Sequence, residues 1–180
     1  MSKKLNELTK RARSIRLIGM DVDGVLTSGE IVVLQTGEEI KFWNAKDRLL
    51  LAHLGKTDIP LRCAWITGRA SKAVTSAAKD LKIKYVVQKS HDKKGAFDKI
   101  LKKEKLSYAQ AAFIGDDLID LGLLRRVGLS VCPRDAASDV KKIVHYVSPY
   151  KGGRGVVRDV LELILKAQNK WDSITRHYLA

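Results

Sequence analysis

The chain has 180 residues, 45% of them hydrophobic, which suits one domain with a sizeable buried core. No apolar run approaches the roughly 18 residues of a membrane-spanning helix. The basic segment 1–14 lacks the apolar run and cleavage site of a secretory signal. These features argue against a membrane or secreted protein, and we expect a cytoplasmic one.

The net charge of +14 invites the hypothesis of nucleic acid binding. The basic residues are spread along the chain, for example at 102–103 and 141–142, and aromatic residues make up 6% of the composition. Base stacking needs aromatic side chains interleaved with positive charge, so a basic nucleic-acid-binding module is the weaker hypothesis. A basic surface equally suits a small anionic substrate.

Short apolar segments alternate with amphipathic ones. Six segments have the composition of buried strands: 16–20, 62–66, 85–87, 111–114, 129–131 and 145–147. Between them, apolar residues recur at helical spacing, most clearly in 70–81 and 156–165. This alternation indicates βαβ units, so we expect an α/β fold with a Rossmann-like open parallel sheet and helices on both faces.

Segment 29–43 interrupts the alternation. Two β-rich halves flank Gln35-Thr36-Gly37, which predicts a β-hairpin inserted after the first strand. No interval is long enough for a separate cap domain. We therefore expect a single domain over 1–180, with a C-terminal loop and helix at 150–170 and an active site that lies open unless a partner subunit covers it.

Polar clusters follow four of the predicted strands. Asp21-Val22-Asp23-Gly24 ends the first strand, Thr67-Gly68-Arg69 ends the second, Lys93-Lys94 lies shortly after the third, and Gly115-Asp116-Asp117 ends the fourth. Ligands of open parallel sheets bind outside the carboxyl ends of the strands, so the four clusters should meet at one place.

The residue types at this edge favour phosphoryl chemistry. Carboxylates grouped without nitrogen or sulfur ligands suit a hard cation, and Mg²⁺ is the one that recruits phosphate. Asp21 and Asp116 are the natural ligands, while Thr67 adds a hydroxyl and Lys93 a second positive charge. Such a site stabilises a phosphoryl group by positioning and charge neutralisation. One aspartate can attack phosphorus, and its neighbour two residues on can move the proton.

Together these motifs resemble those of the haloacid dehalogenase superfamily, in the same order along the chain. The segments are 21–27, 66–69, Lys93 and 115–120. The likeness is closest to the capless sugar-acid phosphatases of that superfamily and extends over nearly the whole chain, including the hairpin, 42–47, 126–131 and 152–158.

The resemblance implies a role for each matching residue. Asp21 would be the nucleophile and a metal ligand, and Asp23 the general acid and base, binding the metal through its backbone carbonyl. Asp116 would complete the protein ligands of Mg²⁺. Thr67 would hold phosphoryl oxygens, and Lys93 would bridge nucleophile and phosphate. The remaining residues carried over are Asp117 and Asp120 as supporting carboxylates, and Asn44, Lys46, Asp47, Gly68 and Arg69 as substrate-binding residues.

The resemblance also implies a substrate, an assembly and a pathway. The expected substrate is a keto-deoxy sugar-acid phosphate, 3-deoxy-D-manno-octulosonate 8-phosphate first, with a nine-carbon keto-deoxy sugar acid 9-phosphate as the alternative. Relatives of this kind are homotetramers in which a neighbour's hairpin and C-terminal tail help to close the site. They serve in lipopolysaccharide synthesis.

This chain departs from the family pattern in its substrate loop, Trp43-Asn44-Ala45-Lys46-Asp47-Arg48. Family members commonly have arginine where Lys46 stands and glycine where Arg48 stands. Lysine keeps the charge but lacks the planar fork that binds a carboxylate at two points. Two further family arginines fall on Ala52 and Ala77. The phosphate end of the site is therefore intact, and the departures concern the sugar end.

Each motif also has a structural alternative. Asp21 and Asp23 could be turn or capping residues, and Thr67 could cap a helix. Lys93 lies in a lysine-rich stretch that could be a solvated face. Residues 152–155 could be a plain loop before the last helix.

Overall fold

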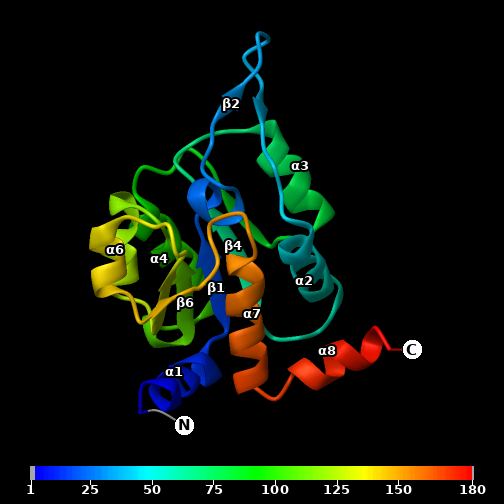
Figure 1. Ribbon diagram of the computed structural model, residues 1–180, viewed down its shortest axis with the longest axis vertical. Helices are drawn as coiled ribbons and strands as arrows, with labels where there is room; N and C mark the ends of the chain where they lie inside the picture. The colour runs from blue at the N-terminus through cyan, green and yellow to red at the C-terminus, as the bar shows by residue number, and fades with distance from the viewer. Residues whose placement is uncertain (1–2, 180) are drawn as a thin grey trace.

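The computed structural model describes residues 3–179 and shows a six-stranded parallel sheet between two layers of helices (Figure 1). The sheet order is β5-β4-β1-β6-β7-β8. The strands are β1 (Leu17–Met20), β4 (Arg62–Ile66), β5 (Tyr85–Val87), β6 (Ala111–Ile114), β7 (Leu129–Cys132) and β8 (Tyr146–Val147). The predicted α/β class, the parallel sheet and all six strands are confirmed, with shifts of one residue at three strand ends.

The helices cover both faces of the sheet. They are α1 (Lys3–Ser14), α2 (Ala45–Lys56), α3 (Lys72–Asp80), α4 (Lys93–Glu104), α5 (Leu121–Leu124), α6 (Ser138–Ile143), α7 (Val156–Ala167) and α8 (Trp171–His177). The core on one face is formed with α1, α2, α3, α7 and α8. The core on the other is formed with α4, α5 and α6. None of the helices between residues 3 and 179 is long and apolar enough to cross a membrane.

Strand β1 lies at the centre of the sheet between β4 and β6, and all four of its residues are buried. Met20 is paired in register with Trp65 on one side and with Ile114 on the other. Because the three strands run parallel, the loops that follow them emerge side by side. This arrangement brings the predicted polar clusters together.

The predicted hairpin is present as β2 (Val32–Val33) and β3 (Glu39–Ile40), which pair antiparallel. Figure 1 shows it extending beyond the body of the molecule, above the end of β1. Most of its apolar side chains are exposed: Ile31, Val32, Val33, Leu34, Ile40 and Phe42. Within residues 3–179, no insertion large enough for a cap domain follows β1 besides this hairpin.

Candidate active site

Asp21 lies at the carboxyl end of β1, where the backbone leaves the sheet and enters the helical turn η1 (Val22–Leu26). Its amide donates to the carbonyl of Ile114 at 3.0 Å, which continues the pairing with β6 by one residue. One carboxylate oxygen of Asp21 accepts from the amide of Val22 at 2.7 Å. The apolar strand therefore holds this carboxylate, 7% exposed, in one place at the sheet edge.

Three carboxylates meet at this edge. Oxygens of Asp21, Asp116 and Asp120 all lie within 4.8 Å of one another. Asp120 is fully buried and accepts from the amide of Asp116 at 3.0 Å. Both Asp116 and Asp120 come from the loop after β6 and its short helical turn η3 (Leu118–Asp120).

Lys93, the first residue of α4, lies between two of these carboxylates. Its Nζ is 2.7 Å from Asp21 Oδ2 and 2.8 Å from Asp120 Oδ1. Burial lowers the pKa of the ammonium, but Asp120 and Asp21 outweigh this effect and the net pKa is raised. Lys93 is therefore a buried cation at the carboxylates; the alternative of a solvated face does not fit it.

The charge of this cluster is unbalanced without a further cation. Burial raises the pKa of Asp21 to about 6, although Lys93 opposes the rise. Burial and the neighbouring Asp21 and Asp120 raise the pKa of Asp116 to about 7. Asp116 Oδ1 is buried and has no hydrogen-bond partner among residues 3–179. A lone buried carboxylate oxygen beside a second carboxylate fits a hard divalent cation such as Mg²⁺, which takes oxygen ligands.

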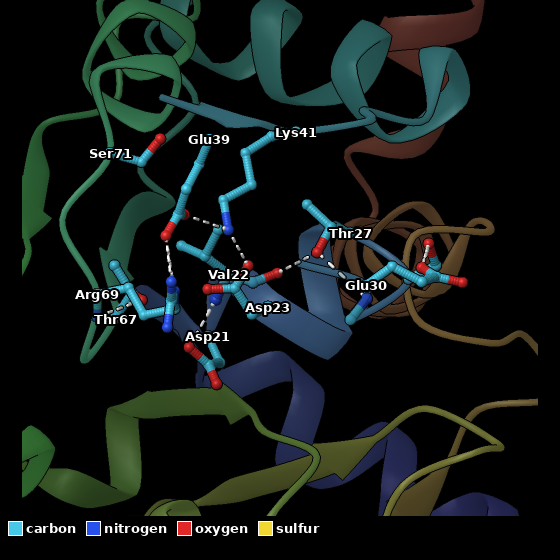
Figure 2. Close-up of polar contacts among 12 residues, drawn as sticks. Asp21, Val22, Asp23, Thr27, Glu30, Glu39, Lys41, Thr67, Arg69 and Ser71 are labelled. Atoms are coloured by element: carbon cyan, nitrogen blue, oxygen red, sulfur yellow. Dashed lines mark hydrogen bonds and ion pairs between the residues drawn. The ribbon is translucent and has the colours of Figure 1, made fainter. Parts of the chain in front are cut away.

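Asp23 lies apart from this cluster and has its own cation. Its carboxylate contacts the Nζ of Lys41, a buried lysine at the base of the hairpin. Lys41 Nζ also lies 3.1 Å from Glu39 Oε2, and the other oxygen of Glu39 contacts the Arg69 guanidinium. Figure 2 shows Glu39 of β3 reaching toward Arg69, and Lys41, directly after β3, reaching toward Asp23. Sequence analysis did not identify Lys41 or Glu39, because their partners are distant in the chain.

The loop after β4 places Thr67 and Arg69 at the same edge. The Thr67 hydroxyl, 2% exposed, accepts from the amide of Arg69 at 3.2 Å. The carbonyl of Thr67 accepts from the amide of Ser90 at 3.0 Å, which ties this loop to the one that leads to Lys93. Asp117, in contrast, is exposed, and its carboxylate accepts from the amide of Leu118 at the start of η3.

The predicted substrate loop at 43–48 is held by two helix caps, one at α2 and one at α7. Asn44 Oδ1 accepts from the amides of Lys46 and Asp47 at 2.9 and 3.3 Å and so caps α2. Asp47 is 2% exposed and accepts from the amides of Gly155 and Arg158 at 3.2 and 2.7 Å. The structure thus shows Asp47 as the cap of α7, and its contact with a substrate stays a prediction.

Two residues of this loop, Trp43 and Arg48, contact other elements of the fold. Arg48 pairs with Asp80 at the end of α3. Trp43 stacks on Trp65 of β4 with ring centroids 5.7 Å apart. Lys46 is exposed in the first turn of α2. The guanidinium of Arg48 is therefore held at the surface by its ion pair with the end of α3.

The glycine-rich loop 152–155 packs against the loop Asp21-Val22-Asp23-Gly24 (the DVDG loop) and the turn that follows it. It therefore has a supporting role and is not a plain connecting loop. The amide of Gly153 donates to the carbonyl of Val25 at 2.9 Å. A Cβ on Gly152 would lie 1.9 Å from the carbonyl oxygen of Gly24, and a Cβ on Gly24 would lie 2.1 Å from Asp116 Oδ2. The backbone leaves no room for a side chain at Gly152, and one at Gly24, where φ is +90°, would displace the carboxylate of Asp116. The DVDG loop is thus confined between Gly152 and the carboxylates.

An open parallel sheet whose central strand ends in a buried aspartate, with two further carboxylates, a bridging lysine and a buried hydroxyl beside it, defines a phosphoryl-group hydrolase. A family model of haloacid dehalogenase-like hydrolases matches residues 57–160. The chain belongs to this family, and it is a phosphoric monoester hydrolase.

The chain is similar in sequence to known phosphatases over most of its own length and of theirs. The 3-deoxy-D-manno-octulosonate 8-phosphate phosphatase of Yersinia pestis is 41% identical over 170 residues, which are 94% of this chain and 90% of that protein. The phosphatase of the same description from Escherichia coli K12 is 39% identical, over 92% and 87% of the two chains. The phosphatase from Moraxella catarrhalis, solved with a magnesium ion, a phosphate ion and a KDO molecule, is 36% identical with a TM-score of 0.92, over 96% and 98%.

Proposed function

We propose that the protein is a Mg²⁺-dependent phosphatase that hydrolyses 3-deoxy-D-manno-octulosonate 8-phosphate through an aspartyl-phosphate. The observation that carries this proposal is the contact of Lys93 with Asp21 inside the cluster with Asp116 and Asp120. The relatives described as phosphatases for this substrate support the choice of sugar acid. The expected place of the enzyme is lipopolysaccharide synthesis in the cytoplasm.

The chemistry divides between the two aspartates of the DVDG loop. An oxygen of Asp21 attacks phosphorus, the bond from phosphorus to the sugar oxygen breaks, and Asp23 gives that oxygen a proton. Asp23 then takes a proton from water, the water oxygen attacks phosphorus, and the bond to Asp21 breaks to release phosphate. Lys93 and the Thr67 hydroxyl hold the phosphoryl oxygens.

Mg²⁺ would be held by Asp21, Asp116 and the backbone carbonyl of Asp23, with Asp117 and Asp120 supporting. Bound there, it would neutralise charge on the phosphoryl group. Asp120 holds the amide of Asp116 and the ammonium of Lys93, so it orients both.

Recognition of the sugar acid would fall to the loop at 44–48 and to Arg69, next to Gly68. Arg69 is 44% exposed at its side chain and is held by Glu39, so its free edge can meet a carboxylate. Lys46 would supply a point charge in place of the usual arginine. Because this end of the site departs from the family pattern, the nine-carbon sugar acid 9-phosphate is the alternative substrate.

Closure of the site would require assembly. The hairpin exposes Ile31, Val33 and Phe42 to solvent, which is apolar surface of the kind found at interfaces. We propose a homotetramer in which a neighbour's hairpin and C-terminal segment cover the substrate. The chain would act as one domain over 1–180.

The test is phosphate release from eight- and nine-carbon keto-deoxy sugar acid phosphates, with and without Mg²⁺. Activity should require Mg²⁺ and favour the eight-carbon substrate. Asp21→Asn should abolish turnover, whereas Asp139→Asn, a surface aspartate paired with Lys142, should not. Turnover that survives Asp21→Asn would sink the mechanism. Salt-dependent retention of RNA or DNA without turnover would favour the nucleic-acid-binding module instead.

A further inference from the structure

Lys41 is a buried cation that the steps above do not use. Its side chain is 1% exposed, although it belongs to a hairpin that otherwise extends into solvent. The ammonium contacts the carboxylate of Asp23 and lies 3.1 Å from Glu39 Oε2. Lysine is almost never fully buried unless it is paired, so this amine is held by the two carboxylates.

The pairing extends into a chain of alternating charges. Asp23 comes from the loop after β1, Lys41 and Glu39 from the base of the hairpin, and Arg69 from the loop after β4. The side chains of Asp23 and Glu39 are 17% and 12% exposed. Figure 2 shows the four groups in succession above Asp21. The hairpin is thus joined to both loops by ion pairs at the site itself.

The two aspartates of the DVDG loop therefore have separate cations. Lys93 contacts Asp21 and Asp120, and Lys41 contacts Asp23. The cluster of close carboxylates consists of Asp21, Asp116 and Asp120 and does not include Asp23 among the described residues. A freely rotating Asp23 could turn toward that cluster or its cation; the ion pair with Lys41 opposes this.

We propose that Lys41 is a positioning residue that holds the carboxyl group of Asp23 on the hairpin side of the site, where the sugar oxygen leaves. The inference rests on the proposed function insofar as Asp23 moves the proton. Without Lys41, Asp23 and Glu39 would be left as neighbouring like charges. Asp23 would then lose its place relative to the departing oxygen, while Asp21 and Lys93 would keep theirs.

This role predicts a dependence on the leaving group. An alkoxide is a strong base and must receive a proton as its bond to phosphorus breaks. A nitrophenolate is a weak base and leaves without one. Loss of Lys41 should therefore slow the first step for alkyl phosphates far more than for nitrophenyl phosphate. The second step uses Asp23 as the base for water with either substrate, so it should slow equally for both.

The experiment is rapid-mixing kinetics of Lys41→Met in Mg²⁺, with p-nitrophenyl phosphate and the sugar-acid phosphate as substrates. We expect kcat for the alkyl phosphate to fall about 10²-fold, within the usual contribution of general acid catalysis, with KM changed less than about threefold. Nitrophenyl phosphate should show a burst of nitrophenolate whose rate stays within about tenfold of wild type, followed by slow turnover. The burst amplitude counts folded sites, so partial misfolding lowers the amplitude and leaves the rate unchanged.

Four further variants distinguish positioning of Asp23 from support of the fold. Lys41→Gln keeps a polar side chain and should behave as Lys41→Met, and Lys41→Arg should recover part of the alkyl phosphate activity. Glu39→Gln loosens the hairpin but leaves Lys41 on Asp23, so it should be milder. Lys72→Met removes an exposed lysine of α3 that pairs with Glu38 of the hairpin. It should leave the turnover of both substrates unchanged. A nitrophenolate burst in the Lys41 variants that slows as much as the first step of the alkyl phosphate, or no loss with either substrate, would overturn the proposal.

The outcome is separable from the choice of sugar. A wild-type enzyme that rejects the sugar-acid phosphate but hydrolyses glycerol phosphate contradicts the proposed substrate, and the comparison is then made with glycerol phosphate. A chain that hydrolyses no phosphate monoester contradicts the proposed function and the role of Lys41 together.

Discussion

At the scale of residues, the site holds more negative than positive charge. Asp21, Asp116 and Asp120 surround one ammonium, that of Lys93. With all four groups ionised, the cluster carries two uncompensated negative charges in a largely buried place. The pKa values of Asp21 and Asp116 are raised because a buried carboxylate whose charge is not compensated prefers its neutral form.

This imbalance predicts how metal-free stability depends on pH. The folded pKa values of about 6 for Asp21 and about 7 for Asp116 exceed the usual 3.8, so the folded chain binds protons more tightly than the unfolded chain. That contribution to stability is complete below about pH 4 and is lost as the pH rises through about 6 and 7. In EDTA, the Tm of wild type relative to Asp116→Asn should fall by roughly 3–8 °C between about pH 5 and pH 8. Mg²⁺ should restore the Tm of wild type at the higher pH. A Tm difference that does not change with pH would contradict this account.

Lys93 should matter for both stability and turnover. Lys93→Met leaves the fully buried Asp120 without its cation, and breaking such a pair typically costs about 3–5 kcal/mol. We expect a clear loss in the free energy of unfolding by urea and no measurable turnover. Lys94→Met is the matched control, because Lys94 pairs with Asp98 at the surface and such pairs contribute at most about 1 kcal/mol. If the Lys94 variant lost activity and the Lys93 variant kept it, the assignment of the bridging lysine would be wrong.

At the scale of elements, loops that are far apart in sequence hold the site together. The loop at 152–155 lies against the DVDG loop, and Asp47 at the start of α2 caps α7 directly after that loop. The hairpin adds the ion pairs of Lys41. The loop at 21–24 is therefore held at its start by β1, on one side by the loop before α7, and through Asp23 by the hairpin.

Gly152→Ala should test this support. The new Cβ would lie 1.9 Å from the Gly24 carbonyl oxygen, so the DVDG loop must shift. We expect kcat to fall by about tenfold or more, since small displacements at a reacting centre are costly, together with a lower Tm. Gly122→Ala is the control, because a Cβ there meets nothing within 4 Å and alanine favours helix. Unchanged kcat in Gly152→Ala would show that the loop is not confined as described.

Much of this arrangement could be predicted from sequence, for reasons that particular residues make clear. The strand segments are continuous apolar runs, and polar residues at their ends define the edge where Asp21, Thr67 and Asp116 meet. The role of Lys41 could not be predicted this way, because no feature of the neighbouring sequence indicates its ion pair with Asp23. The capping role of Asp47 could not be predicted either, because its partners, Gly155 and Arg158, are equally remote in the sequence. Helix α1 was not predicted, although Leu5, Leu8 and Ala12 recur at helical spacing among its lysines and arginines.

At the scale of the whole molecule, the hairpin exposes apolar side chains that contacts within one copy of the chain do not bury. Its strands are only two residues long, yet it exposes Val33 at 55% and Phe42 at 67%. Such a short hairpin gains little stability alone, and burial of its apolar side chains by a neighbour would stabilise it.

Val33→Glu should therefore weaken assembly. We expect light scattering after gel filtration to show a smaller particle than wild type, and the sugar-acid phosphatase activity to fall as the neighbour's hairpin is withdrawn. Val86→Glu, which places the same charge at an exposed position on β5, is the comparison. An unchanged particle in Val33→Glu would argue against a hairpin-mediated assembly.

The contact between Gly152 and the DVDG loop also has a consequence for biosynthesis. Asp21 leaves the ribosome directly after β1, but the loop that confines it is translated only after β8. Strand β1 must also wait for β4 and β6 on its two sides. We expect nascent chains that stop before Gly152 to lack hydrogen-exchange protection at the amides of Val22 to Thr27. Longer chains should gain this protection in one step, so the site would be catalytically silent until residues 152–155 have emerged.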